Sequence, residues 1–140
     1  MIGVLIVNYN NIELTKNCIE SLDKQNNKKF EIYLFDQNSD EVGTSEFLTQ
    51  CEEKKIKVFR NSENVPLNHL WNDFKNICPH RMLCFLNNDV VLSKTFIDDT
   101  TNVFNTNSKV GIVIHVTNNP QYLKAEKTLK YAILEPAFYQ

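Results

Sequence analysis

The chain has 140 residues, of which 42% are hydrophobic and 23% charged, a composition that fits one ordinary soluble globular domain. The net charge of −2 argues against partners attracted by a basic field, such as nucleic acid or an anionic membrane surface. No stretch approaches the ~20 apolar residues that cross a bilayer, and the opening segment lacks the basic region of a signal peptide.

Apolar runs alternate with helically spaced apolar residues along the first 116 residues. Strands are predicted at residues 3–8, 30–35, 56–59, 82–86 and 110–116. Helices are predicted at residues 12–25, 44–54, 66–78 and 94–105. Asn10 or Asn11 is expected to cap the first helix. This alternation predicts a three-layer α/β/α fold with a mostly parallel, doubly wound sheet.

The strand at 82–86 is an unbroken apolar run, which is typical of a strand buried on both faces in the middle of a parallel sheet. Because side chains alternate along a strand, Cys84 and Leu86 are expected on one face and Phe85 on the other. In the preceding helix, Trp71 has helical spacing with other apolar residues and is expected in the core.

The tail predicts a helix over residues 120–127 and an edge strand over 129–134. With no repeat or linker, residues 1–140 are expected to form a single domain. The four cysteines lack C-x-x-C spacing and fall in predicted helices or strands. They indicate reduced thiols in a cytoplasmic protein, and neither a zinc site nor a disulfide framework is expected.

Polar residues follow each of the first four predicted strands, and in a parallel sheet these positions meet along one edge. They are Asn8, Tyr9, Asn10, Asp36, Asn38, Arg60, Asn61, Asn87, Asn88 and Asp89. The set would suit a nucleotide, with an aromatic ring for the base, a guanidinium group and two carboxylates. Asp89 taken alone also fits a turn residue or a helix cap.

The turn after the first strand has no glycine pattern, and the chain has three glycines in all. Dinucleotide-binding and P-loop phosphate cradles are therefore excluded. A divalent cation on Asp89 is the alternative device for neutralising phosphates, since Mg²⁺ or Mn²⁺ needs only one or two protein oxygens when it also binds a diphosphate.

Four pieces of the sequence, in this order, resemble the nucleotide-diphospho-sugar transferase fold and the inverting glycosyltransferases of family 2. They are Val4–Asn10, Cys18–Leu22, the Asp36–Asp40 cluster and Phe85–Val90, the last in the Leu-Asn-Asn-Asp form of rhamnosyltransferase-like members. The resemblance covers residues 3 to about 116. It implies metal-assisted transfer of a sugar from a nucleotide-diphospho-sugar to an acceptor hydroxyl, with inversion.

The resemblance also implies roles for individual residues. Tyr9 and Asp36 would contact the base and the ribose, and Asn8, Asn10, Arg60 and Asn88 would lie at the nucleotide. Asp89 would bind Mg²⁺ or Mn²⁺ on the diphosphate. The chain departs from the family because one carboxylate of its D-x-D motif is replaced by Asn87 and because it is short. Glu135 is the candidate catalytic base.

The predicted partners are a UDP- or TDP-sugar donor and a saccharide or lipid-linked acceptor, with self-association as a further expectation. The expected location is the cytoplasm, including the inner face of the membrane. Two alternatives stay open. One is a binding module that keeps the nucleotide half without catalysis. The other is a nucleotidyltransferase, which the Asn8–Asn11 turn disfavours because those enzymes use a loop rich in glycine and basic residues.

Overall fold

The computed structural model describes residues 1–115 and 131–134. The chain divides into two compact units, Met1–Ile97 and Asp98–Gln140, and each is described by itself. The helices and strands are β1 Ile2–Asn8, α1 Ile12–Asp23, β2 Phe30–Asp36, α2 Thr44–Glu53, β3 Lys57–Arg60, α3 Leu67–Ile77, β4 Met82–Asn87, α4 Phe96–Thr106, β5 Ile112–His115 and β6 Tyr131–Leu134.

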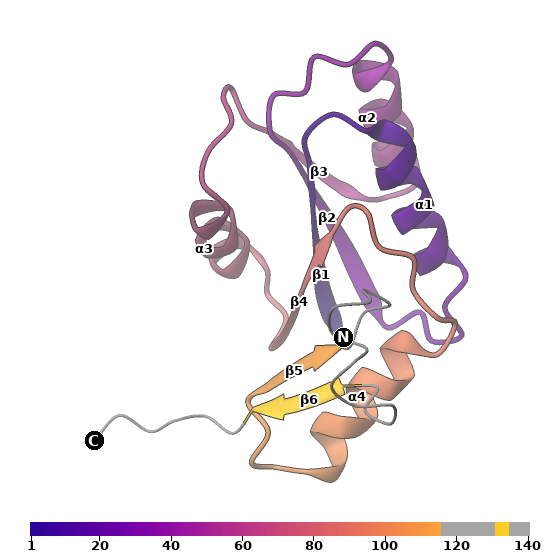
Figure 1. Cartoon of the computed structure of the whole chain (residues 1–140), viewed down its shortest axis with the longest axis vertical. Coiled ribbons are helices and arrows are strands. Elements are labelled where there is room, and N and C mark those ends of the chain that lie inside the picture. The colour runs from indigo at the N-terminus through magenta and orange to yellow at the C-terminus, as the bar shows by residue number, and fades with distance from the viewer. Residues whose placement is uncertain (116–130, 135–140) are drawn as a thin grey trace, which may run out of the picture. The chain divides into compact units, whose positions relative to one another are not determined.

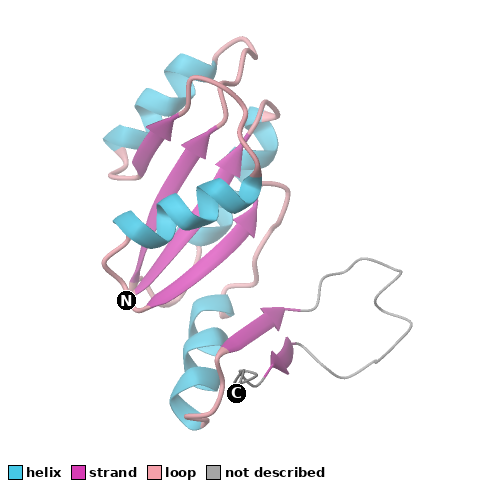
Figure 2. Ribbon diagram, turned by 90° about the vertical axis from the view of Figure 1, so that its left-hand side faces the viewer, coloured by secondary structure: helices cyan, strands magenta, loops and turns pink. Residues whose placement is uncertain are grey.

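The first unit contains a four-stranded parallel sheet with the strand order β3-β2-β1-β4. Helices α1 and α2 cover one face of the sheet and α3 covers the other (Figures 1 and 2). This three-layer, doubly wound arrangement confirms the fold class predicted from the sequence. The chain adds strands in one direction up to β3 and then crosses to the far side of β1. The carboxyl ends of β1 and β4 therefore flank the point where the direction of winding switches.

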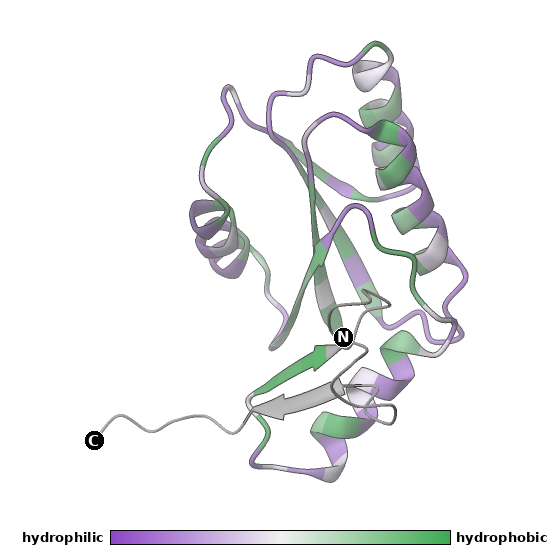
Figure 3. Cartoon of the chain, in the orientation of Figure 1, coloured by the Kyte–Doolittle hydropathy of each residue, from purple (hydrophilic) through white to green (hydrophobic). Residues whose placement is uncertain are grey.

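Each face of the sheet has its own apolar core, because alternate side chains of a strand point to opposite faces. On the side of α1 and α2, Val4 and Ile6 of β1 are fully buried with Leu22 of α1. On the side of α3, Leu5 packs with Phe74. In Figure 3 hydrophobic and hydrophilic residues alternate along α1 and α2, as expected for helices with one buried side.

The prediction that residues 82–86 form a central strand is wrong for the part of the chain that the structure describes. There β4 lies at the edge of the four-stranded sheet, paired with β1 alone, and is half-buried. The central strands are β1 and β2. The apolar run of β4 is explained by helices on both faces of the sheet, which require apolar side chains without requiring a strand on each side.

The predicted facing of the β4 side chains is confirmed. Cys84 and Leu86 pack against the core on the side of α1 and α2. Phe85 makes an edge-to-face contact with Phe74 of α3, with ring centroids 5.7 Å apart. Burial raises the pKa of the Cys84 thiol to about 12. The Cys84 thiol is therefore a poor nucleophile at neutral pH.

In the second unit, β5 pairs antiparallel with β6, with Ile112 opposite Leu134 and His115 opposite Tyr131. The expected fifth parallel strand at 110–116 is thus replaced by a strand of a separate two-stranded sheet. The tail strand predicted at 129–134 is present as β6. The helix predicted at 120–127 and the candidate base Glu135 lie outside the described residues. The expectation of a single domain stays a prediction.

The prediction that Trp71 belongs to the core is wrong, since its side chain is 46% exposed. Helix α3 buries only Leu70 and Phe74 against the sheet. Helical spacing marks the apolar side of a helix, but it does not say how wide a stripe the sheet covers. Trp71 lies beside the buried stripe, where its ring packs against Phe85 with centroids 5.6 Å apart.

The close approach of α3 to the sheet depends on Gly3 in β1. A β-carbon at this position would lie 2.2 Å from the sulfur of Cys78 and 3.1 Å from the ring of Phe74. We expect Gly3→Ala to reduce the free energy of unfolding by about 1–3 kcal/mol, the cost of overpacking a filled core. Urea denaturation measures the effect. Adding Cys78→Ala should make the double variant more stable than the sum of the two single changes allows, and strict additivity would contradict the proposed clash.

Candidate functional site

The carboxyl edge of the first unit is organised around the buried side chain of Asp36, the last residue of β2. The Asp36 side chain is completely buried, and its Oδ1 accepts hydrogen bonds from Asn8 Nδ2 at 2.7 Å and from Ser39 Oγ at 2.5 Å. Its Oδ2 accepts from the backbone N–H of Ser39 at 3.2 Å. A buried carboxylate is tolerated only when it is paired and hydrogen-bonded in this way.

Arg60, at the end of β3, supplies the charge that compensates Asp36. Its Nε lies 3.4 Å from Asp36 Oδ2, and its Nη2 donates to the carbonyl of Ser39 at 3.0 Å. The guanidinium side chain remains 43% exposed. One face of the Arg60 group is therefore fixed by the protein, while the side chain still reaches solvent at the edge of the sheet.

The loop after β2 also fixes the loop after β1. Ser39 Oγ accepts from the backbone N–H of Asn10, and Asn10 Oδ1 accepts from the backbone N–H groups of Asp40 and Glu41. Glu41 then caps α1, because its Oε2 accepts from the N–H of Ile12 at 3.0 Å. Asn11 stands at the N-cap position with φ at 54°, but its side chain makes no capping bond. The expected cap by Asn10 or Asn11 is thus replaced by a carboxylate from another loop.

A second chain of hydrogen bonds joins the end of β1 to the end of β4. Thr15 Oγ1, on the buried side of α1, donates to Asn8 Oδ1 at 2.6 Å. The same oxygen accepts from Asn88 Nδ2 at 3.0 Å. Asp36, Asn8, Thr15 and Asn88 therefore form one continuous network, which is called the edge network below.

Helix α1 and the turn after it also hold the loop that follows β4. The Sγ of Cys18 contacts the carbonyl of Asn87 at 3.7 Å. Farther along, Gln25 Nε2 donates to the carbonyl of Ser93 and Gln25 Oε1 accepts from the N–H of Ile97. The loop is thus anchored at one end to α1 and at the other to Gln25, just after the end of that helix, and Asp89 lies between the anchors.

Asp89 is exposed and makes no hydrogen bond or ion pair with any other residue that the structure describes. Burial raises the pKa of the nearby Cys18 thiol to about 12, and the Asp89 carboxylate contributes to that rise. The described residues contain no group of three or more His, Cys, Asp or Glu side chains able to hold a metal. The oxygen donors available here are the carboxylate of Asp89 and the amide oxygen of the residue before it in the sequence, Asn88. That fits a hard cation whose remaining ligands come from a diphosphate and water.

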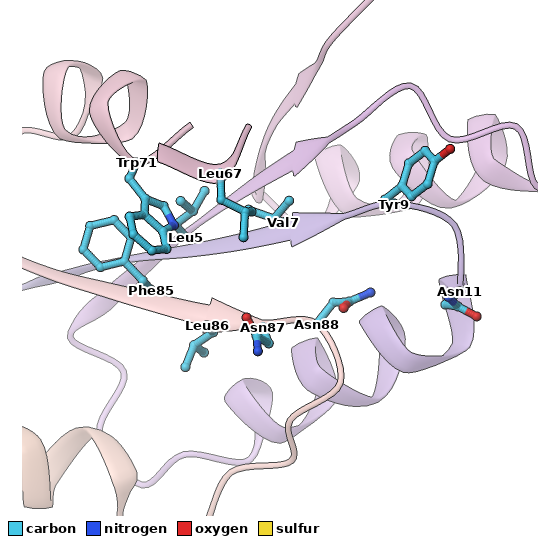
Figure 4. A pocket seen from close by; sticks show the side chains of 10 residues that line it. All are labelled: Leu5, Val7, Tyr9, Asn11, Leu67, Trp71, Phe85, Leu86, Asn87 and Asn88. Carbon is cyan, nitrogen blue, oxygen red and sulfur yellow. The ribbon is translucent and has the colours of Figure 1, made fainter. Parts of the chain in front are cut away.

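A cavity of about 300 Å³ opens on the α3 side of the same edge (Figure 4). Trp71 and Phe85 lie together at one end, Tyr9 lies at the other, and Asn87 and Asn88 lie between them. The lining residues are Leu5, Val7, Tyr9, Asn11, Leu67, Trp71, Phe85, Leu86, Asn87 and Asn88. Apolar walls with a few amide groups at the mouth are typical of small-molecule sites.

The structure divides the predicted site residues between two sides of the edge. Asn8, Asp36, Arg60 and Asn10 belong to the hydrogen-bonded side, where Asn8 and Asp36 are fully buried. Tyr9, which is 51% exposed, lines the cavity on the other side. Asn88 takes part in both, while Asp36 and Asp89 are not among the residues that line the cavity.

Several residues that shape this edge were not predicted from the sequence. Thr15 is a polar residue on the buried stripe of an amphipathic helix, and a buried polar side chain requires a partner. That requirement is the signal that could have identified it. Gln37 is also buried, and it bonds Asn61 and Val65 in the loop that leads to α3. No pattern in the sequence marks Gln37.

The family model described as "Glycosyl transferase family 2" matches residues 3–136. No curated protein matches the sequence. Among solved structures, S. aureus TarS 1–349 superposes with a TM-score of 0.71 and 18% identity over 89% of this chain. The mannosyltransferase PcManGT from Pyrobaculum calidifontis, in complex with GDP-Man and Mn2+, superposes with a TM-score of 0.73 and 15% identity over 86% of this chain.

A further structure, S. aureus TarS 1–349 in complex with UDP-GlcNAc, has a TM-score of 0.67 and 19% identity over 84% of this chain. At these identities the similarities establish the fold. The matched parts are 40%, 36% and 35% of the three solved chains, so this chain spans well under half of their length.

The contact between Asn8 and Asp36 can be tested with a nearly isosteric change. Asn8→Asp would place a second carboxylate against Asp36 in a fully buried position, so one of the two must hold a proton in the folded state. The folded-state pKa of that group would rise above its unfolded value of ~3.9. We expect a loss of about 3 kcal/mol in unfolding free energy at pH 7, which shrinks as the pH falls to 4.

Chemical denaturation at several pH values measures this effect. The matched control is Asn10→Asp, which also stands beside a carboxylate, with Asn10 Nδ2 3.1 Å from Asp40 Oδ1, but in an exposed contact. Solvent screening should keep the control within about 1 kcal/mol of the wild type. Equal losses of unfolding free energy in the two variants would mean that burial of the Asn8–Asp36 contact does not make it more sensitive to a second carboxylate than an exposed contact.

Proposed function

Because the chain belongs to glycosyl transferase family 2, we propose that it binds a nucleotide-diphospho-sugar at the carboxyl edge of the β3-β2-β1-β4 sheet. We propose further that it takes part in transferring the sugar to an acceptor hydroxyl, and that the sugar is of hexosyl or rhamnosyl type. The observation that carries the proposal is the position of the cavity. It opens where β1 and β4 end, at the switch point of a doubly wound sheet, and this is where such sheets bind ligands.

We assign different parts of the nucleotide to different described residues. Tyr9 is an exposed aromatic ring at the mouth of the cavity and is assigned to the base. Arg60 reaches solvent from the neighbouring strand end and is assigned to the base or a phosphate. Asn10 lies at the rim, but its side chain is occupied by the loop after β2.

The buried position of Asp36 changes the role we assign to it. All of its described bonds go to protein groups, and its side chain has no exposed surface. We therefore assign it to hold Arg60 and Asn8 in place, instead of the direct contact with base or ribose that the family resemblance implies. Asn8, also fully buried, acts on the nucleotide through Asn88 and not by touching it.

Asp89 and Asn88 would hold Mg²⁺ or Mn²⁺ against the diphosphate. When bound, the cation neutralises the negative charge that develops on the departing nucleoside diphosphate. The protein contributes one exposed carboxylate and one amide oxygen, so affinity for the metal without nucleotide should be weak. PcManGT, whose structure contains GDP-Man and Mn2+, is the neighbour that agrees with this combination of ligands.

In the proposed reaction an acceptor hydroxyl, deprotonated by a carboxylate base, attacks the anomeric carbon from the face opposite the leaving diphosphate. The bond to the acceptor oxygen forms as the bond to the diphosphate oxygen breaks, which inverts the configuration. Glu135 is the proposed base. It lies outside the described residues, and its assignment comes from its place after the last predicted strand.

The proposed donor is a UDP- or TDP-sugar, and the proposed acceptor is a saccharide or a lipid-linked saccharide. UDP-GlcNAc and GDP-Man are the nucleotide sugars found with the neighbouring structures. Within the described residues no helix combines the length and apolar character needed to cross a bilayer. We propose a cytoplasmic location, including the inner face of the membrane, and a chain that can self-associate.

The role of Asp89 can be tested by calorimetry with UDP in the presence and absence of Mn²⁺. We expect Mn²⁺ to strengthen UDP binding by the wild type, and Asp89→Asn to remove at least about 90% of that gain because the only described carboxylate ligand is lost. Binding without metal should be unchanged. Asp73→Asn, an exposed carboxylate on α3, is the matched control and should behave as the wild type.

Release of UDP from a UDP-sugar in the presence of Mn²⁺ distinguishes the enzyme from a binding module. Turnover that Asp89→Asn abolishes is the expected result. Binding without turnover, across UDP- and TDP-sugars and with acceptors present, would favour the module. If neither UDP nor TDP binds with or without Mn²⁺, the proposal of a nucleotide site is wrong.

A second carboxylate in the loop should strengthen the metal site. Asn87 lines the cavity two residues before Asp89 and is exposed. We expect Asn87→Asp to increase the Mn²⁺ affinity of the UDP complex by about tenfold or more, since charge count tunes the affinity of oxygen-ligand sites. Mn²⁺ titration followed by electron paramagnetic resonance measures the change. Asn76→Asp, on the exposed side of α3, adds the same charge elsewhere and should have no effect. Unchanged affinity in Asn87→Asp would place the metal away from this loop.

A further inference from the structure

The hydrogen bonds of the edge network all run in one direction. Starting from Asp36, each acceptor must face a donor, so the role of each group fixes the role of the next. Asp36 is paired with the Arg60 guanidinium and accepts bonds from every described partner. The Asn8 group that faces Asp36 must therefore be the Nδ2 donor, which turns the Asn8 Oδ1 toward Thr15. The orientation of the Asn8 amide is thus fixed by the hydrogen-bonding roles of its neighbours.

The same reasoning passes through Thr15. A hydroxyl has one proton, and Thr15 uses it to donate to Asn8 Oδ1. Thr15 Oγ1 can then only accept from Asn88, so Asn88 must present its Nδ2 group, as it does at 3.0 Å. The carbonyl oxygen of the Asn88 amide is consequently left as the end of the chain. Reversing any one amide would place two donors or two acceptors face to face.

We propose that Asp36, acting through Asn8 and Thr15, orients Asn88 so that its amide oxygen, and not its NH₂ group, is offered beside Asp89 as a second oxygen ligand. This inference rests on the proposed nucleotide and cation site. It makes Thr15 a positioning residue, since it is fully buried and is not among the residues that line the cavity. A cation repels an NH₂ group and binds a carbonyl oxygen, so the direction of the network decides whether Asn88 helps or hinders metal binding.

In this proposal, the network also explains how a loop with a single carboxylate can bind a divalent cation. Asn88 is held by Thr15 on α1, and Gln25, in the turn after this helix, holds Ser93 and Ile97. The oxygen is therefore orientated before any ligand arrives. Groups that hold and orient metal ligands typically change metal affinity by about 10- to 100-fold when they are removed.

The direct test replaces Thr15 by Val and by Ser. Thr15→Val keeps the shape but removes the hydroxyl, so Asn88 loses its fixed orientation. We expect Thr15→Val to weaken Mn²⁺ binding to the UDP complex by about 10- to 100-fold while leaving metal-free UDP affinity unchanged. Thr15→Ser keeps the hydroxyl and should retain wild-type Mn²⁺ affinity. A purely structural role would lower both affinities together or neither.

The matched control is Ser21→Ala, which removes another buried hydroxyl from α1. Ser21 Oγ donates to the carbonyl of Cys18 and takes no part in the edge network. We expect wild-type Mn²⁺ affinity in Ser21→Ala, with thermal unfolding measured for all variants. Wild-type Mn²⁺ affinity in a folded Thr15→Val protein would overturn the proposal.

A measurement without nucleotide or metal separates this inference from the proposed function. In nuclear magnetic resonance spectra of the ligand-free protein, the Nδ2 protons of Asn88 should show a nuclear Overhauser effect to the methyl group of Thr15. The Asn88 signals should shift in Thr15→Val and stay in place in Thr15→Ser. Absence of that contact would overturn the orientation of Asn88 even if UDP and Mn²⁺ bind. Its presence in a protein that binds neither would instead refute the proposed site and the role given to Asn88 there.

Discussion

The burial of one carboxylate constrains the functional edge of this protein more than any other feature. Asp36 has no exposed surface, so its charge must be met by protein groups: the amide of Asn8, the hydroxyl and backbone of Ser39, and the guanidinium of Arg60. These partners come from the ends of β1 and β3, the two strands that flank β2, and from the loop that follows β2. Satisfying one buried charge therefore sets the relative positions of the loops after β1, β2 and β3. The fourth loop, which carries Asp89, joins the same arrangement through Thr15.

The consequence is an edge with two unlike sides. On the side of α1, every described buried polar side-chain atom has a hydrogen-bond partner. On the side of α3, the cavity has apolar and aromatic walls, and amide groups at its mouth. We propose that the first side is rigid support and that the second receives the nucleotide. In this proposal, residues at the same sheet edge differ in role. Asp36 orients neighbouring side chains, Tyr9 contacts the base of the nucleotide, and Asp89 supplies negative charge for the cation.

The sequence was sufficient to predict the layers of the fold and the edge that carries the site, because strand and helix periods and the polar residues after each strand are local patterns. The order of the strands across the sheet is not encoded in such local patterns. The apolar run of β4 reflects the helices that cover both faces of the sheet, and it was misinterpreted as evidence for a neighbouring strand on each side. The prediction that Trp71 lies in the core was wrong for a related reason. Helical spacing identifies the apolar side of α3, but not how much of that side the sheet covers. The role of Asp36 depends on its burial, which arises only when three strand ends meet. Thr15 was detectable in principle, as a hydroxyl on a buried stripe, whereas its two partners could be identified only from the structure.

The most direct test of the account is a crystal structure of the protein with UDP and Mn²⁺ bound, with the metal located by its anomalous scattering. The account predicts a manganese peak within coordination distance of a carboxylate oxygen of Asp89 and of the amide oxygen of Asn88, with the base in the cavity against Tyr9 and with Asp36 still buried among its partners. UDP bound with its metal away from Asp89, or a base held directly by an exposed Asp36, would contradict it.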